Sequence, residues 1–313
     1  MKRFMKQIFW ICCFCLLFTG CQKQEAAENH TFHITASFYP VYLMALEVAD
    51  GIDGVTVENM AQPQTGCLHD YQMTIADRKK LENSDIFLIN GLGMESFLED
   101  AMEQCPDLQV GDTSAETEAL CAEEHDHDHG DDHDAEEEEV NAHIWLSLEN
   151  AMVQVENIRD ILGQADPVHA EAYAENAAAF LKQAEILLAQ YPHQHGTEGV
   201  FIFHEGFPYL AEHFGFVAEQ GIFPEENDTP TAKELTDAVE EAKADGIQFF
   251  FAADDAGLSY AKILAEEVDG LVVVLDPITS GAGEKGEFLT RMEQNMRTLA
   301  EIMEEGGVSH ENS

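Results

Sequence analysis

Short apolar runs alternate with amphipathic stretches along most of this chain, and the alternation occurs in two separate blocks. The first block opens with the strand-like run HITASF at residues 33–38, and the second begins with VFIFHE at residues 200–205. Helix-like segments follow the strand-like runs, and this βαβα order favours parallel sheets covered by helices. With about four strand-like runs in each block, the sequence predicts an α/β protein with two lobes of (β/α)4 type and parallel sheets.

A long helix-like segment at residues 167–191 lies between the two blocks. Asp166 is predicted as its N-cap and Pro167 as its first residue, and the run that follows is rich in Ala and Leu. About 24 helical residues span about 36 Å, enough to join two lobes as a strut, and a surface helix across one sheet is the alternative. The predicted division is a first lobe at 32–146, helices at 147–192 and a second lobe at 193–313.

The first twenty residues have the pattern of an export signal. Lys2, Arg3 and Lys6 precede an apolar run, residues 8–18, that is too short to span a bilayer as a helix. The run ends in LFTGC, residues 17–21, which resembles a lipobox with Phe18 where Leu is usual, and this predicts lipidation of Cys21. Residues 1–20 are therefore interpreted as a lipoprotein signal peptide and 21–31 as a polar tether; a cleaved signal with an unmodified Cys21 is the alternative.

The charge of the chain restricts the partners it can bind. It has 61 acidic and 15 basic residues and a formal net charge of −46. Such a field repels nucleic acid and anionic lipid head groups and attracts cations. The sequence therefore predicts no nucleic-acid binding, and a metal ion or a basic surface as the charged partner.

Three cysteines lie outside the leader and anchor: Cys67, Cys105 and Cys121. An odd number leaves at least one of them unpaired unless a bridge forms between molecules. Cys105 and Cys121 can pair outside the cytoplasm, but the sequence leaves that pairing open.

An acidic loop at residues 114–140 interrupts the first block, with HDHDHGDDHDAEEEE at residues 125–139. No core can bury so many carboxylates, so this loop must be solvated. Its alternating His and Asp is a composition typical of weak metal binding, which we expect of four residues: His125, His127, His129 and His133. A solvated spacer without a transport role is the alternative.

Four possible metal ligands follow strand-like runs, two in each block: His69, His143, His204 and Asp276. In open α/β sheets, ligands bind at the carboxyl ends of the strands. Three imidazoles and one carboxylate suit tetrahedral Zn²⁺ and favour it over Mn²⁺. Each residue also has a structural interpretation: a hydrogen-bonded loop histidine, a buried His143 in a strand, or an Asp276 that starts a turn at Pro277.

Four segments, in order, resemble the zinc/manganese solute-binding proteins of ABC importers. In that family a His precedes a Tyr-containing run and a later N-G-x-G-x-E motif, which His69, Tyr71 and NGLGMES match. NAHIWLSLENA resembles the segment that carries the second ligand, here His143. IFHEGFPYLAEHFGF and VVVLDPI resemble the segments that carry the last two, here His204 and Asp276.

The match runs from about residue 33 to residue 303, and the acidic His-rich insertion is typical of the zinc-uptake branch, the ZnuA-like proteins of cluster A-I. The resemblance implies two lobes joined by one long rigid helix, a metal between the lobes, and delivery of that metal to a membrane permease. A rigid helix further implies small lobe movements rather than wide hinge closure.

Three positions depart from the family pattern. Cys67 stands two residues before His69, where a small residue is usual, and is either an additional thiolate ligand or a half-buried small residue. Glu205 follows His204 near the point where manganese-type relatives ligate through an acid, so it is a possible additional ligand. Ala252 stands where relatives often have Glu or Gln.

The predicted function is an extracytoplasmic zinc receptor that is not an enzyme. We expect a monomer, anchored by lipid to the cell membrane and facing outside the cytoplasm, that delivers Zn²⁺ to the permease of an ABC importer. The sequence leaves open Mn²⁺ or iron as the cargo, and does not indicate a one- or two-membrane cell.

Two other classes remain as alternatives, an extracellular zinc hydrolase and an adhesin. Glu205 beside His204 is a conceivable general base, but the chain has no H-E-x-x-H motif, and Pro208 stands four residues after His204. No residue pattern favours an adhesin. His193 and His195 are interpreted as loop residues, and His213 as a packing or surface residue.

Overall fold

The computed structural model describes residues 31–61, 71–121, 140–221, 231–253 and 256–305. Residues 32–313 form one unit that contains two four-stranded sheets. All strand pairs within these sheets are parallel, which confirms the α/β prediction. No helix among the described residues is both long and apolar enough to cross a membrane.

The first sheet has the strand order β2-β1-β3-β4. Its strands are β1 (Phe32–Ala36), β2 (Val55–Asn59), β3 (Ile86–Ile89) and β4 (Val110–Asp112). The helices that alternate with them are α2 (Tyr39–Ala49), α3 (Ile75–Glu82) and α4 (Leu98–Gln104). Helix α3 begins with the capping box expected of Thr74 and Asp77, in which each side chain accepts from the other residue's backbone N–H.

The second sheet repeats this arrangement with the order β6-β5-β7-β8. Its strands are β5 (Glu198–Ile202), β6 (Phe216–Gly221), β7 (Phe249–Ala252) and β8 (Leu271–Val274). The helices are α7 (Phe207–His213), α8 (Ala232–Asp245), α9 (Ala256–Val268) and α10 (Glu287–Glu305). The predicted capping box of Thr231 and Glu234 starts α8.

Two helices in succession connect the sheets, α5 (Leu148–Ala165) and α6 (Ala170–Gln190), after a short 3₁₀ helix, η1 (Ile144–Leu146). The predicted strut is α6, but it begins at Ala170 rather than Pro167, so the N-cap prediction for Asp166 was wrong. Asp166 instead ends α5, and its carboxylate accepts hydrogen bonds from the Tyr173 hydroxyl at 2.8 Å and His169 Nδ1 at 2.6 Å. The chain needs these residues to turn before it reverses into α6.

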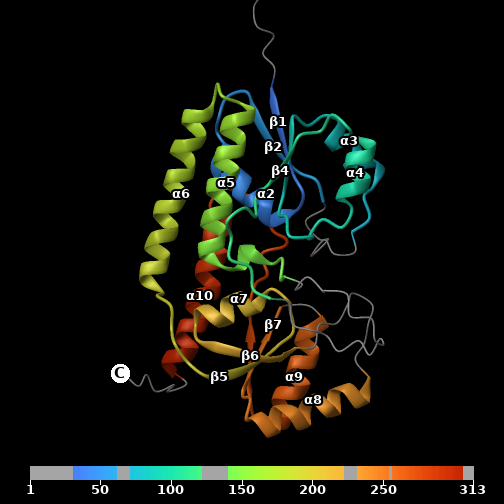
Figure 1. The fold of residues 1–313 in the computed structure, drawn as a ribbon. Helices are drawn as coiled ribbons and strands as arrows, with labels where there is room; N and C mark the ends of the chain where they lie inside the picture. Colours follow the sequence, from blue (N-terminus) through green and yellow to red (C-terminus); the bar gives the residue numbers. More distant parts are fainter. Residues whose placement is uncertain (1–30, 62–70, 122–139, 222–230, 254–255, 306–313) are drawn as a thin grey trace, which may run out of the picture. The chain divides into compact units, whose positions relative to one another are not determined.

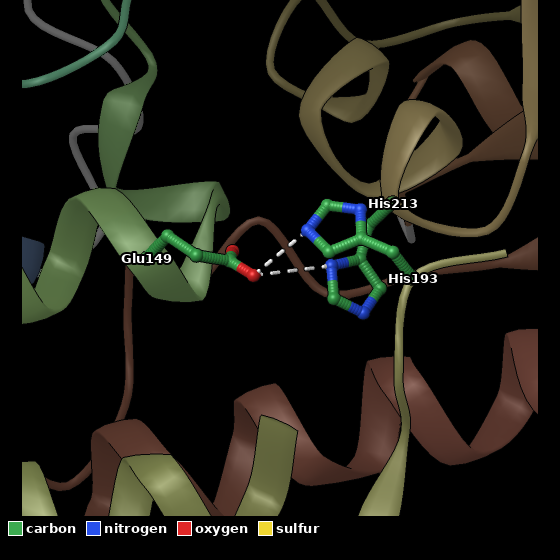
Figure 2. Close-up of side chains that lie close together, drawn as sticks. All are labelled: Glu149, His193 and His213. Carbon is green, nitrogen blue, oxygen red and sulfur yellow. Dashed lines mark hydrogen bonds and ion pairs between the residues drawn. The ribbon is translucent and has the colours of Figure 1, made fainter. Parts of the chain in front are cut away.

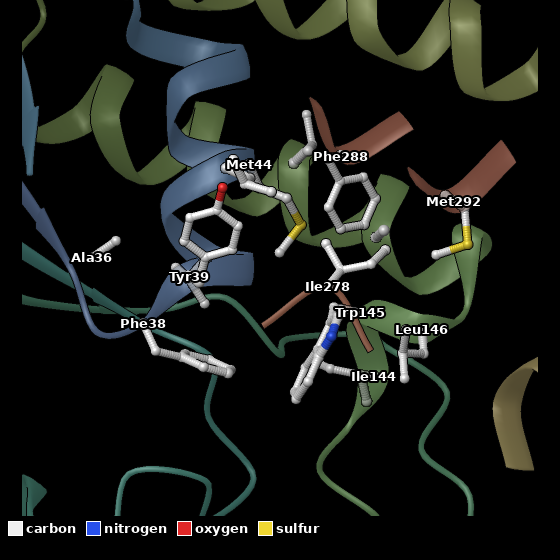
Figure 3. Packing of buried hydrophobic residues seen from close by; sticks show 14 of the residues in the cluster. Ala36, Phe38, Tyr39, Met44, Ile144, Trp145, Leu146, Ile278, Phe288 and Met292 are labelled. Carbon is white, nitrogen blue, oxygen red and sulfur yellow. The ribbon is translucent and has the colours of Figure 1, made fainter. Parts of the chain in front are cut away.

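Figure 1 shows α6 lying beside α5 and leading toward β5, while α10 runs alongside. Helix α10 contacts both α2 and α6. The sequence predicted that one helix joins the lobes, whereas in the structure α10 packs beside that helix and supports it. The core continues across the junction, where Phe38, Trp145, Ile278 and Phe288 are fully buried (Figure 3). Wide separation of the two lobes would expose this apolar surface to water, and the free-energy cost of that exposure opposes the separation.

The two described cysteines, Cys105 and Cys121, are not joined by a disulfide. Cys105 is buried, whereas Cys121 is exposed and pairs through its backbone with Val140 in an isolated bridge. The pairing that the sequence left open is therefore absent between these two residues.

Candidate metal centre

His143 and His204, which we call the junction pair, come from different lobes and lie close together. Their ring centroids are 5.5 Å apart, and the ring planes meet at 76°. His143 immediately precedes η1 and is 2% exposed, whereas His204 follows β5 and is partly buried. The structure thus brings together one predicted ligand from each lobe.

The hydrogen bonds of His143 set its tautomer. Asn141 Nδ2 donates to the Glu205 carbonyl at 2.7 Å, which fixes Asn141 Oδ1 as the acceptor for the His143 backbone N–H and for Nδ1, both at 3.0 Å. Nδ1 therefore carries the proton, and the lone pair of a neutral imidazole lies on Nε2. That is the form in which metal-binding histidines are usually oriented by a neighbouring acceptor.

His204 is held differently. The backbone N–H of Gly206 donates to His204 Nδ1 at 3.1 Å, and the ring stacks on Phe207 with centroids 4.8 Å apart. A bond accepted by Nδ1 places the proton of a neutral ring on Nε2. Metal binding through Nε2 therefore requires this contact with Gly206 to be given up.

Gly206 is a residue that the sequence reasoning did not identify. A Cβ at this position would lie 2.5 Å from Leu146 Cδ1 and 3.1 Å from His143 Cβ. A side chain at position 206 would therefore require Leu146 and His143 to shift away from the turn after β5. The only feature of the sequence that could have indicated this close contact is the glycine two residues after His204.

In the first lobe, the buried carboxylate of Glu95 stabilises the backbone near His143 through hydrogen bonds. Glu95, in the NGLGMES segment, accepts from the Ser37 hydroxyl at 2.7 Å and from the backbone N–H groups of Asn90 at 2.7 Å and Gly91 at 3.1 Å. Asn90 Nδ2 in turn donates to the carbonyl of Ala142, next to His143, at 2.9 Å. Burial, opposed by these hydrogen bonds, raises the pKa of Glu95 to about 7.

Asp276 follows β8 and forms a salt bridge with Arg291 of α10. Arg291 Nε donates to Oδ2 and Nη2 to Oδ1, both at 2.5 Å, and the backbone N–H of Ile278 also donates to Oδ1 at 2.8 Å. A carboxylate offers about four acceptor positions, so one on Oδ2 remains after these three. The Ile278 bond also matches the turn that the sequence gave as the alternative.

A chain of contacts connects Asp276 to the junction pair. Trp145 Nε1 donates to the carbonyl of Pro277 at 2.9 Å, and the Trp145 ring centroid lies 5.0 Å from that of His143. Asp276 is thus adjacent to a residue that touches the same tryptophan as His143.

The other predicted site residues lie outside the described residues. These are Cys21, Cys67, His69, His125, His127, His129 and His133. Glu205 is described: its side chain is exposed, and its carbonyl accepts from Asn141. Ala252 is buried in β7.

The family model described as "Zinc-uptake complex component A periplasmic" matches residues 34–302. The chain belongs to this zinc-uptake component A family. The match spans both sheets, the junction pair and Asp276.

Among curated relatives, the zinc-binding lipoprotein AdcA of Streptococcus pneumoniae is 28% identical over 308 residues, covering 94% of this chain and 60% of AdcA. The chain thus spans about three fifths of that relative's length. The iron-binding protein YfeA of Yersinia pestis is 26% identical over 297 residues, covering 88% of this chain and 89% of YfeA.

Solved structures share the fold of this family member. Zn(II)-bound AdcA from Streptococcus pneumoniae superposes with a TM-score of 0.69 at 25% identity, covering 87% of this chain and 57% of AdcA. FpvC from Pseudomonas aeruginosa in complex with Mn²⁺ gives a TM-score of 0.75 at 23% identity, covering 88% of this chain and 99% of FpvC. At that identity the second likeness establishes the two-lobed fold alone.

Proposed function

We propose that this chain is an extracytoplasmic zinc receptor that delivers Zn²⁺ to the permease of an ABC importer. The observation that carries the proposal is the junction pair, in which two imidazoles from different lobes lie edge to face in a member of a family of zinc-uptake components. Zinc is the cargo and not a resident cofactor. His69 and Asp276 complete the proposed ligand set with His143 and His204.

The donor set favours zinc over manganese. Three nitrogens and one carboxylate suit a tetrahedral Zn²⁺ ion, whereas Mn²⁺ prefers oxygen ligands. Glu205 and Cys67 are the residues that would change this preference if they joined the site. A related iron-binding protein of similar identity, YfeA, favours iron as an alternative cargo. Manganese is the other alternative.

Arg291 is proposed to keep Asp276 in place before zinc arrives. Its planar guanidinium binds both carboxylate oxygens, which restricts the carboxylate orientation and leaves one acceptor position for the ion. Because the lobes share one core and are supported by both α6 and α10, zinc entry is proposed to need only local movement of the turns that carry the ligands.

A competition titration of the full chain tests the choice of cargo. Zinc is expected to displace manganese completely when both are present at equal concentration, and the metal content of protein purified without added metal should be mainly zinc. If manganese or iron displaced zinc under these conditions, the proposed cargo would be wrong.

The acidic His-rich loop is proposed to collect zinc weakly and raise its local concentration. Calorimetry on a variant lacking residues 123–139 should show fewer weakly bound zinc ions than the full chain, while tight binding stays. An unchanged number of weakly bound zinc ions would rule out this role.

Attachment through a lipidated Cys21 is proposed to hold the receptor at the outer face of the cell membrane as a monomer. A Cys21→Ser variant should lose the lipid and leave the membrane fraction.

Binding, rather than catalysis, is proposed as the activity. Zinc-dependent hydrolysis of peptides or phosphoesters that is abolished in the H143A variant would favour the hydrolase alternative.

A further inference from the structure

Three side chains of metal-ligating types, none of them in the junction pair, lie close together. Glu149 comes from the first turn of α5, His193 from the segment after α6, and His213 from the last residue of α7. One ligand atom from each lies within 4.8 Å of the other two (Figure 2). We call these three residues the Glu149 cluster.

His213 is oriented as a metal ligand would be. Its Nε2 lies 2.8 Å from the carbonyl oxygen of Tyr191, and because a carbonyl only accepts, Nε2 must carry a proton. In the neutral ring the lone pair is then on Nδ1, which faces Glu149 Oε1 at 3.6 Å. His213 is 7% exposed, and burial lowers its pKa.

That arrangement places two acceptors opposite each other. The Nδ1 lone pair of neutral His213 and the Glu149 carboxylate oxygen repel unless a cation lies between them. His193 Nε2 lies 2.9 Å from the same oxygen, and the rings of His193 and His213 are only 4.0 Å apart. A proton shared between His193 and Glu149 satisfies that pair but not His213, whereas a metal ion satisfies all three.

The other oxygen of the Glu149 carboxylate is already positioned. Ser147 Oγ donates to Oε2 at 3.2 Å, which leaves Oε1 directed at the two imidazoles. The side chains of Glu149 and His193 are 40% and 57% exposed, so water can reach the ligands to complete the coordination. In tetrahedral zinc with bonds of about 2.0 Å, ligand atoms are about 3.3 Å apart. The separations of 2.9 and 3.6 Å lie on either side of this value.

We propose that Glu149, His193 and His213 form a second Zn²⁺ site, separate from the junction pair, with water as the fourth ligand. Two imidazoles and a carboxylate are ligands that zinc accepts readily. A zinc ion here ties the start of α5 to the end of α7 and to the segment that leaves α6. The site does not depend on the cargo proposed for the junction pair.

Histidine modification by diethyl pyrocarbonate, read by peptide mass spectrometry on the full chain, tests this site directly. Added zinc should slow modification of His193 at least several-fold and leave His195, two residues away and also exposed, unchanged. Because the readout is specific to each residue, zinc bound at the junction pair or the acidic loop does not obscure it. Equal effects of zinc on His193 and His195 would overturn the proposal.

Two variants give a second test that does not depend on modification chemistry. H193Q should bind one zinc ion fewer than the matched control H195Q, and both side chains are exposed enough for the protein to fold. E149Q should abolish the zinc protection of His193. If H193Q and H195Q bound the same number of zinc ions, or if E149Q kept the protection, the three residues would be only an ion-pair cluster.

Discussion

The junction pair and the Glu149 cluster each contain two close imidazoles, but they are held by different means. At the junction, the tautomer of His143 depends on a side chain, Asn141, and the close approach of the lobes depends on Gly206. In the Glu149 cluster, the tautomer of His213 depends on a backbone carbonyl, and the carboxylate is within hydrogen-bond distance of an imidazole. The first is a contact between the residue before η1 and the turn after β5, and the second is a half-exposed contact among the start of α5, the end of α7 and the segment after α6.

This difference indicates that the two regions bind zinc with different affinities. His143, a proposed ligand that is almost fully buried, is shielded from competing water, and its hydrogen bonds to Asn141 orient the ring before any ion binds. An exposed carboxylate and imidazole lose side-chain entropy on binding and are screened by salt. We therefore expect tight zinc binding at the junction and weaker binding at the Glu149 cluster.

Removal of a junction ligand should have the largest effect. H143A is expected to lower the affinity of the tight zinc site by about 100-fold or more, because loss of a ligand should exceed the loss of a residue that only orients one. A chelator-competition titration measures it, with H193Q as the matched control that leaves the tight site intact. Equal effects of H143A and H193Q on the tight site would remove the distinction between the two regions.

The close contact at Gly206 gives the next largest effect. G206A places a Cβ against Leu146 and His143 and should lower the free energy of unfolding by about 1–3 kcal/mol as well as weaken tight zinc binding. Urea denaturation measures the stability.

Gly163 in α5 provides the control for that substitution. A Cβ there would meet Ala170 Cβ at 3.6 Å, an ordinary contact, so G163A should be neutral or stabilise the protein by about 0.5–1 kcal/mol. A G206A variant as stable as G163A would show that the lobes do not meet as described.

The buried Glu95 makes the stability of the first lobe sensitive to pH. The pKa of Glu95 in the folded protein, about 7, lies above its unfolded value of 4.5, so burial favours the protonated form. Its contribution to stability is complete below the unfolded pKa and is lost as pH rises through about 7. Between pH 5 and 7 this loss is about 2 kcal/mol.

The stability difference between the wild-type protein and E95Q isolates this contribution. Wild type minus E95Q should fall by about 2 kcal/mol from pH 5 to 7 in urea denaturation, because E95Q cannot ionise. When E149Q is introduced into both proteins, the difference in stability between them should be unchanged over the same pH range. A difference that rises with pH would contradict the assignment.

The smallest predicted effect comes from the residue that orients His143. N141A removes the acceptor for Nδ1 and should weaken tight zinc binding by about tenfold, the lower end of what such residues contribute. Stability should be compared at the same time, because Asn141 also links to the carbonyl of Glu205. Unchanged zinc affinity in a folded N141A variant would mean that the tautomer is set by another group.

Local patterns predicted much of the fold. The alternation of strand-like and helix-like runs predicted two parallel sheets, and the pairs Thr74–Asp77 and Thr231–Glu234 predicted two helix starts, because a capping box depends only on residues three apart. The same reasoning placed the start of α6 three residues too early. Asp166 and Pro167 have the right spacing for a cap, but α5 extends to Ala165 and needs those residues for its turn.

The candidate sites were less accessible from the sequence. His143 and His204 were chosen because they follow strand-like runs, and the structure places their rings together. The Glu149 cluster was missed because its three residues come from three separate elements and have no characteristic spacing. His213 was interpreted as packing or surface, and it is indeed buried, but the orientation of its Nδ1 depends on a tertiary hydrogen bond that no sequence pattern encodes.

A crystal structure of the zinc-loaded full chain tests the central claim most directly. The account predicts one zinc ion bonded at about 2.0–2.1 Å to a ring nitrogen of His143 and to a ring nitrogen of His204. The Gly206 contact to His204 Nδ1 should be lost if that bond is made through Nε2. Zinc bound to only one of these histidines, or to neither, would contradict the claim that the two lobes hold the ion together.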